Sequence, residues 1–95
     1  MSRIDVQCDE NDEGWICEVT VDPDSKPSKH EVTLPRDDYQ DLSGESATPE
    51  QLIEESFYFL LEREPKNAIL SSFEIRTIET YFPEYPKKIL KRLRS

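Results

Sequence analysis

Three side chains are the candidates for nucleophilic or metal chemistry: the thiols of Cys8 and Cys17 and the imidazole of His30, the one histidine in the chain. A zinc site takes about four nitrogen, sulfur or oxygen ligands, and a Ser-His-Asp or Cys-His arrangement would depend wholly on His30. His30 is in phase with Val32 and Leu34 at the start of a predicted strand. We therefore expect a partly buried structural histidine and predict a protein that is not an enzyme, with no metal and no cofactor.

The two cysteines have three interpretations. Across a hairpin, Cys8 and Cys17 can form a disulfide, contribute to a metal site or fill space as small apolar groups. Two cysteines do not make the disulfide framework of a small secreted scaffold, and free cysteines are among the most buried residue types. We therefore favour buried, reduced thiols.

Targeting signals and membrane spans are not visible in the sequence. Residues 1–10 contain no apolar stretch of the kind that a secretion signal needs. The longest apolar run, residues 57–61, is too short to cross a bilayer. We expect a cytoplasmic protein without membrane association.

Other motifs for ligand chemistry are incomplete. Residues 9–14, DENDEG, partly match a calcium loop, but Thr20 stands at the twelfth position, where such loops carry a bidentate glutamate. A glycine-rich phosphate loop cannot be built because the chain has only Gly14 and Gly44. We therefore interpret residues 9–14 as a solvated hairpin tip and expect no small-molecule substrate.

The charge is large and unevenly distributed. The net charge is −9, whereas residues 86–95 contain five basic residues and no acidic one. The body of the chain is therefore strongly negative and lacks the electrostatic attraction that dominates nucleic-acid affinity. We expect a protein partner, in particular a basic one, and regard nucleic acid as the less favoured ligand.

The basic C-terminal segment is the main candidate for an interaction surface. Its cations either dock on the acidic body of the same chain or bind a partner, an anionic membrane surface or RNA. We favour docking on the chain itself, because its acidic residues are available nearby. The candidate partner-binding residues, including two aromatic positions of the long helix, are Lys87, Lys88, Lys91, Arg92, Arg94, Tyr58 and Phe59.

Alternating apolar residues predict two strands of a hairpin, around residues 4–8 and 15–21. Placing Cys8 opposite Cys17 brings six apolar residues to one face and leaves residues 11–14 as a four-residue connection. The six are Ile4, Val6, Cys8, Cys17, Val19 and Val21. A third strand, residues 30–34, should stop at Pro35, which cannot donate to a ladder. Residues 36–42 are predicted to form one or two helical turns that end at Gly44.

A helix over residues 49–64 has the strongest signals. Thr48 and Gln51 make a capping box, Pro49 suits the first helical position, and Pro65 terminates the helix. Its apolar stripe is too wide for a helix on a three-stranded sheet alone, so another element or another subunit must cover the rest. We therefore expect a homo-oligomer that associates through the surplus apolar face.

The C-terminal third is predicted to complete the core. Ser72 can cap a short helix over residues 73–82, or Phe73 can begin a fourth strand, and Pro86 opens a last helix. The fold class is thus α+β in a single domain, residues 1–95. It contains an antiparallel sheet of three to four strands, the helix of residues 49–64 packed on it and short C-terminal helices.

Residues 29–64 resemble a ribbon-helix-helix unit: a strand, Leu-Pro, a short helix, a turn and a capped second helix. This resemblance implies that Lys29, Glu31 and Thr33 enter the DNA major groove. It also implies that the start of the second helix, near Thr48, sits on phosphate. Glu31 has no balancing arginine there, and an unpaired acid near phosphate weakens binding. A DNA-binding transcriptional regulator is therefore the alternative function.

Residues 3–64 resemble the small α+β domain of HicB-type antitoxins. The matching stretches are RIDVQCDENDEGWICEVTV and the T-P-E-x-L-I-x-x-S helix that starts at Thr48. The resemblance implies a sheet backed by a helix, oligomerisation and neutralisation of a basic RNA-cleaving toxin. Residues 22–29 depart from the proline- and cysteine-containing segment of that family. The function that we expect is a small acidic interaction or regulatory module.

Overall fold

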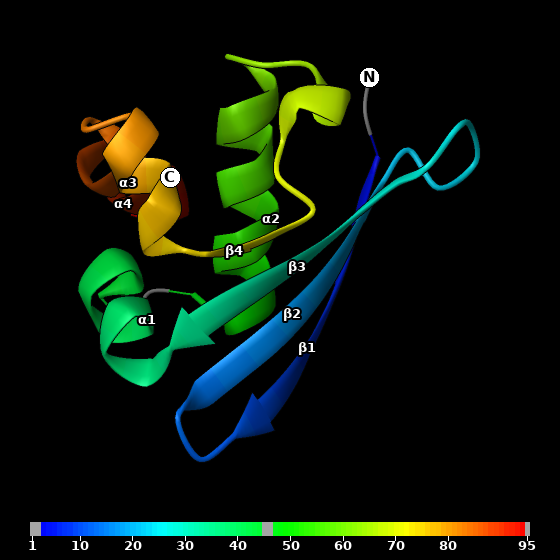
Figure 1. Ribbon diagram of the computed structural model, residues 1–95. Helices are drawn as coiled ribbons and strands as arrows, with labels where there is room; N and C mark the ends of the chain where they lie inside the picture. The colour runs from blue at the N-terminus through cyan, green and yellow to red at the C-terminus, as the bar shows by residue number, and fades with distance from the viewer. Residues whose placement is uncertain (1–2, 45–46, 95) are drawn as a thin grey trace.

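The computed structural model describes residues 3–44 and 47–94. It contains a four-stranded sheet in the order β1-β2-β3-β4, with α2 lying across one face (Figure 1). The fold class α+β is confirmed. The elements are β1 Ile4–Asn11, β2 Gly14–Val21, β3 Ser28–Pro35, α1 Arg36–Ser43, α2 Pro49–Leu61, the 3-10 helix η1 Lys66–Ala68, β4 Ser72–Glu74, α3 Arg76–Tyr81 and α4 Tyr85–Arg94.

The predicted register of the first hairpin is confirmed. β1 and β2 are antiparallel, with Ile4 opposite Val21, Val6 opposite Val19 and Cys8 opposite Cys17. Asn11 also pairs with Gly14, so Asp12 and Glu13 alone make the connection, which is shorter than the four residues predicted. Gly14 has φ 149°, and a Cβ there would lie 2.3 Å from the carbonyl oxygen of Leu34. Only glycine fits this close approach of β2 to β3.

Cys8 and Cys17 form a disulfide across the hairpin, with their Cα atoms 4.0 Å apart. The prediction of buried, reduced thiols is therefore wrong. The physical reason is the register itself, because directly opposed residues on one face of a hairpin bring their Cβ atoms within reach of a bond. The expected cytoplasmic location rested in part on free thiols, and it stays a prediction.

The fourth strand makes the sheet mixed. β3 pairs antiparallel with β2 on one side and parallel with β4 on the other, so the prediction of a purely antiparallel sheet is wrong. Parallel neighbours need a crossover connection, which α1, α2 and η1 provide here. Residues 73–82 contain both of the predicted alternatives, since Phe73 lies in β4 and α3 begins at Arg76. Ser72 lies in β4 instead of capping the helix, and Ile75 occupies the N-cap position.

α2 begins as predicted. The Thr48 hydroxyl accepts a hydrogen bond from the backbone N–H of Gln51 at 3.1 Å, and the Gln51 side chain accepts one from the Thr48 N–H at 2.9 Å. The helix ends at Leu61 rather than at residue 64. The residue before Pro65 is restricted to extended conformations, so the chain leaves the helix ahead of the proline.

The shorter helices confirm two further predictions. α1 occupies the predicted segment and ends at Gly44, whose φ of 56° is left-handed. α4 contains Pro86 in its first turn, where a missing N–H costs no helical hydrogen bond. The structure contains no helix, among residues 3–44 and 47–94, with the length and apolar composition needed to cross a membrane.

The apolar stripe of α2 is covered within the chain. Phe57 faces the sheet beside His30, whereas Phe59 points the other way and is fully buried. The ring centre of Phe59 lies 5.3 Å from that of Tyr85 in α4 and 5.9 Å from that of Phe82. The C-terminal third therefore covers the stripe, as predicted. Self-association was expected through a surplus apolar face of α2. Because that face is covered within the chain, it no longer supports this expectation.

A buried chain of hydrogen bonds joins α2 to α4. The Ser56 hydroxyl donates to the carbonyl oxygen of Leu52 at 2.6 Å, so it accepts from the Tyr85 hydroxyl, 2.7 Å away. Burial raises the pKa of Tyr85 well above the ordinary tyrosine value. The phenol therefore stays protonated and remains a donor, which fixes α4 against the long helix.

Candidate functional site

The basic helix α4 docks on its own chain. Tyr85 and Ile89 are buried, and Arg92 lies across α2, where it pairs with Glu62 and, at 3.7 Å, with Glu55. The hydrogen bond from Arg92 lowers the pKa of Glu62, with smaller contributions from the charges of Arg92 and Arg63. The favoured interpretation of the C-terminal segment is thus confirmed for one face of α4.

The other face of α4 points to solvent. Lys87, Lys88, Lys91 and Arg94 are exposed, and Leu90 is partly buried among them. Among the described residues, Lys87, Lys88 and Arg94 make no ion pair. Lys87, Lys91 and Arg94 flank an open surface rather than an enclosed site. The structure therefore separates Arg92, which holds the helix in place, from the other basic candidates.

The two aromatic candidates lie on different sides of α2. Phe59 is in the core and is not accessible to a partner. Tyr58 is half-buried, and partial burial followed by the charges of Glu54 and Glu55 raises the pKa of its phenol. The seven residues predicted to bind a partner therefore do not form one continuous surface.

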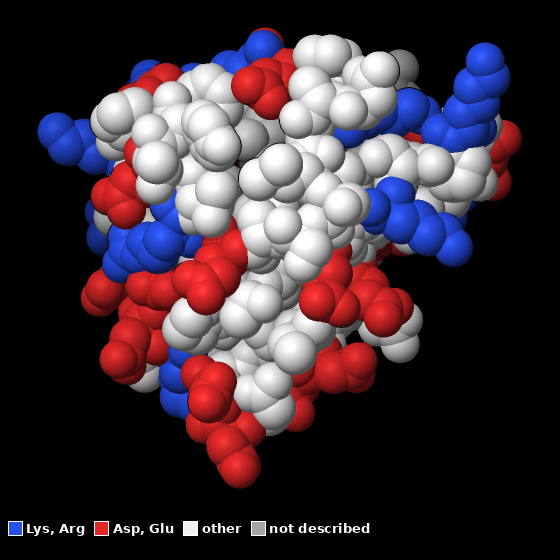
Figure 2. All heavy atoms as spheres, in the orientation of Figure 1, with Lys and Arg blue, Asp and Glu red and all other residues white. Residues whose placement is uncertain are grey.

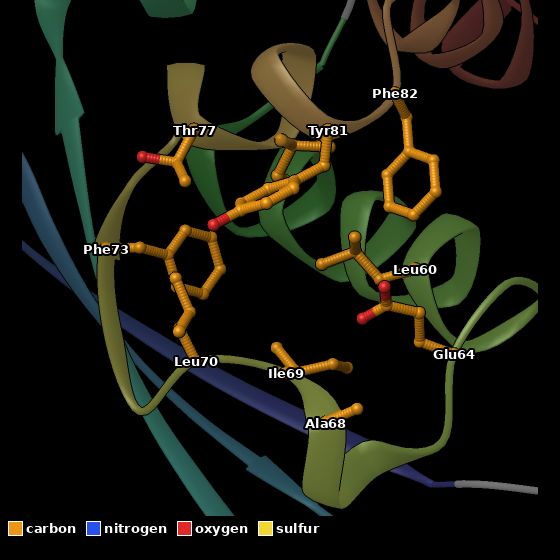
Figure 3. Close-up of a pocket in the computed structure, with 10 residues that line it drawn as sticks. Leu60, Glu64, Ala68, Ile69, Leu70, Phe73, Thr77, Tyr81 and Phe82 are labelled. Atoms are coloured by element: carbon orange, nitrogen blue, oxygen red, sulfur yellow. The ribbon is translucent and has the colours of Figure 1, made fainter.

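A hollow that sequence reasoning missed lies at the other end of α2. It has a volume of about 180 Å³ and is enclosed by the end of α2, residues 66–70, β4 and α3 (Figure 3). We call this hollow the groove. Its apolar walls are formed by Leu60, Ile69, Phe73, Ile78 and Phe82.

Two strongly exposed apolar side chains stand at the rim of the groove. Leu70 is 48% exposed and Tyr81 is 65% exposed, and they are two of the three large apolar residues that are exposed among those described. The third, Ile16, lies on the open face of the sheet. Figure 2 shows a broad uncharged surface between α3 and the segment that leads into β4. Apolar surface gathered around a concavity marks a binding site, whereas a single exposed apolar residue does not.

The rim of the groove is held by hydrogen bonds to β3. The backbone carbonyl of Leu70 accepts from Nδ1 of His30 at 2.7 Å, and the N–H of Glu31 donates to the carbonyl of Ser71 at 2.8 Å. Nδ1 carries a proton because a carbonyl oxygen can only accept, and Nε2 lies within hydrogen-bond distance of the hydroxyl of Ser28. The prediction of a structural histidine is confirmed, and its structural role is to place one side of the groove.

The opposite wall is fixed through Arg76, at the start of α3. Its guanidinium donates to Asp38 at 2.8 Å and to Asp41 at 3.0 Å, both in α1, and to Glu79 at 3.2 Å. These hydrogen bonds clamp α3 against α1. The groove therefore lies between two walls that are set before any partner arrives, which lowers the ordering cost of binding.

Glu64 is the one charged side chain in the lining of the groove. Its carboxylate points toward the hollow (Figure 3), it is half-buried, and it makes no ion pair or side-chain hydrogen bond with the described residues. The preceding residue is different, since Arg63 pairs with Glu62 at 3.5 Å and with Glu84 at 3.4 Å. The groove thus combines an apolar wall with a carboxylate that has no cation.

Acidic side chains dominate another part of the surface. Figure 2 shows acidic side chains gathered over the lower half of the molecule, where the β1–β2 turn and α1 lie. The open face of the sheet adds further exposed acids, including Glu18 and Glu31, which are directly opposite each other on β2 and β3. Opposed like charges destabilise a sheet, so these acids favour the approach of a cationic surface.

The groove was not predictable from sequence spacing. Its lining comes from four segments, and the exposed Leu70 and Tyr81 belong to no periodic pattern. Residues 68–70, Ala-Ile-Leu, are the one local signal, because an apolar run follows the end of a helix before the next element begins. Within residues 3–44 and 47–94, no group of three or more His, Cys, Asp or Glu side chains is arranged to hold a metal ion.

No protein-family model, curated protein or solved structure matches this chain.

Proposed function

We propose that this chain is a non-enzymatic interaction module that binds a basic protein through the groove. The observation that carries the proposal is the exposure of Leu70 and Tyr81 at the rim of an apolar hollow. Covering two large apolar side chains gives a partner a favourable free energy of burial, roughly 25 cal/mol for each Å² removed from water. The two walls flank a space into which a partner side chain can insert.

The charge of the chain sets the kind of partner. A net charge of −9 attracts a cationic surface and accelerates its association, and it repels nucleic acid. Glu64 supplies a carboxylate inside the binding surface itself, so the complementarity extends to the centre of the contact.

The resemblance to HicB-type antitoxins is compatible with this proposal, because the partner that it implies is a small basic protein. The support from the present chain is its acidic composition and a sheet that carries a helix on one face. Self-association is a weaker part of the proposal, since the stripe of α2 on which it was based is covered within the chain.

The ribbon-helix-helix alternative is less favoured by the position of β3. That function needs the strand to pair with its counterpart in a second chain. Here both edges of β3 are occupied, by β2 and by β4, so a ribbon would require one of these neighbours to leave. Glu31 would also face the phosphates without a compensating cation.

Affinity capture from extracts of the source cells tests the proposed function. The baits are the unmodified chain, the rim variants Leu70→Glu and Tyr81→Glu, and the matched control Ile16→Glu, which makes the same change outside the groove. We expect the unmodified chain and Ile16→Glu to retain the same basic protein, and the rim variants to retain about tenfold less, as expected for central contacts. Equal retention by all four baits would exclude the groove as the binding surface.

A further inference from the structure

We propose that the groove receives a lysine side chain of the partner, with its ammonium group at the carboxylate of Glu64. This inference rests on the proposed function and names the group that the groove recognises. It follows from three features: the apolar lining of the groove, the absence of an ion pair at Glu64 among the described residues, and the contacts that Arg63 makes with aromatic rings and a carboxylate nearby.

The lining suits a flexible alkyl stem. Figure 3 shows the rings of Phe73, Tyr81 and Phe82 around the opening, with the carboxylate of Glu64 at one side and Leu60 beside it. A hollow of about 180 Å³ exceeds the roughly 150 Å³ that is enough to admit a benzene-sized molecule. The methylene groups of a lysine can therefore lie along the apolar wall while the charged end stays near the mouth of the groove.

The carboxylate requires a cation for its charge to be compensated. Glu64 is half-buried against apolar side chains and makes no ion pair with the described residues. Partial burial strengthens its attraction for a cation, since the surrounding dielectric constant is lower than that of water. An apolar ligand without charge would cover this carboxylate and leave it without a partner, which costs free energy.

A neighbouring site in the chain shows the same combination with its cation in place. The guanidinium carbon of Arg63 lies 3.7 Å from the ring centre of Phe59 and 5.9 Å from that of Phe82, and Glu84 pairs with it. The lining of the groove includes Phe82, further aromatic rings and the carboxylate of Glu64. Rings and a carboxylate together bind ammonium groups by cation–π and ionic attraction.

A lysine fits better than an arginine because of shape. The groove presents one carboxylate at one side of a mostly apolar hollow, which matches a compact charge on a four-carbon stem. A planar guanidinium has five donors, and the side chains that line the groove offer few acceptors besides the carboxylate of Glu64 and the hydroxyls of Thr77 and Tyr81. Unpaired donors inside an apolar wall would weaken the binding of arginine.

An NMR titration of the full chain tests the inference directly. The probes are Nα-acetyl-lysine methylamide, its norleucine analogue, which keeps the stem without the ammonium group, and its arginine analogue. We expect the lysine probe to shift the backbone amide signals of Leu70, Thr77 and Tyr81 and to bind about 3- to 10-fold more tightly than the other two. In Glu64→Gln the preference for lysine over norleucine should disappear.

A matched variant and the thermal unfolding of each protein complete the experiment. Glu18→Gln removes one negative charge from the open face of the sheet and should keep the full preference for lysine. Glu64→Gln should unfold at the temperature of the unmodified chain, since Glu64 makes no ion pair or side-chain hydrogen bond with the described residues. Glu18→Gln should unfold at that temperature or slightly above it, since it relieves the repulsion from Glu31 on the neighbouring strand. Equal binding of lysine and norleucine, stronger binding of arginine, or an unchanged preference in Glu64→Gln would overturn the lysine assignment. Any of these results would leave the proposed function intact as long as the rim variants still lose the captured protein.

Discussion

The guanidinium carbon of Arg63 lies 3.7 Å from the ring centre of Phe59, directly over an aromatic side chain that is otherwise covered by α3 and α4. Arg63 also donates to the backbone carbonyl of Phe59 at 3.2 Å and pairs with Glu62 and Glu84. This one cation closes the edge of the core over Phe59. The next residue, Glu64, lines the groove.

Replacing Arg63 tests how much this closure contributes to stability. Arg63→Gln removes the cation–π contact and the ion pairs, so we expect the free energy of unfolding to fall by about 1 kcal/mol. Urea denaturation followed by tryptophan fluorescence measures the change. The control Lys88→Gln removes an exposed cation and should stay within about 0.5 kcal/mol of the unmodified chain. Equal midpoints for the two variants would contradict the role given to Arg63.

The hydrogen bonds between α2 and α4 predict which of two substitutions lowers the free energy of unfolding more. Ser56→Ala leaves the buried hydroxyl of Tyr85 without an acceptor and should cost about 1–3 kcal/mol. Tyr85→Phe removes that hydroxyl while Ser56 still donates to Leu52, so it should cost about 0.5–1.5 kcal/mol. The same urea measurement ranks them. A larger loss for Tyr85→Phe would show that the direction of the hydrogen bond is wrong.

Reduction should weaken the fold. The disulfide between Cys8 and Cys17 closes a short segment, with a sequence separation of 9 residues. Breaking it releases conformational entropy in the unfolded chain, so dithiothreitol should lower the free energy of unfolding by about 2 kcal/mol. The double variant Cys8→Ala with Cys17→Ala is the control, and its unfolding should not respond to the reductant. An equal response of both proteins, or none in the unmodified chain, would argue against the bond.

The contact between Arg92 and Glu62 predicts a pH dependence. The pKa of Glu62 lies below its ordinary value of 4.5, so the contact stabilises the fold while Glu62 is ionised. That contribution is complete above 4.5 and is lost as the pH falls through the lowered pKa. Carboxyl-detected NMR of Glu62 should give a midpoint below 4.5 that moves up in Arg92→Gln and stays in place in Lys87→Gln. An unshifted midpoint in Arg92→Gln would show that α4 does not dock through this pair.

Most of the features of the fold that could be predicted follow from local sequence patterns. The hairpin register follows from six apolar residues that must share a face, and the start of α2 follows from the capping residues Thr48 and Gln51. Both features depend on neighbours in the chain. The position of Gly44 at the end of α1 was predictable for the same reason.

Features that join distant segments were not predictable in this way. The parallel pairing of β4 with β3 brings Phe73 beside Val32, and three residues are too few for a periodic signal. The disulfide was not predicted, because the small number of cysteines argued against one. Its physical cause is the register of β1 and β2, which places Cys8 opposite Cys17. The groove brings residues of α2, η1, β4 and α3 together, and its exposed Tyr81 has the same sequence character as a buried tyrosine such as Tyr85.

The central proposal is that a basic protein binds at the groove. Photo-crosslinking measures this most directly, with p-benzoylphenylalanine introduced at Tyr81 in the groove or, as the control, at Ile16 on the open face of the sheet. In irradiated source cells, the account predicts a covalent adduct with a basic protein from position 81, lost when Leu70→Glu is added, and no such adduct from position 16. The absence of an adduct at position 81, or the same adduct from both positions, would contradict it.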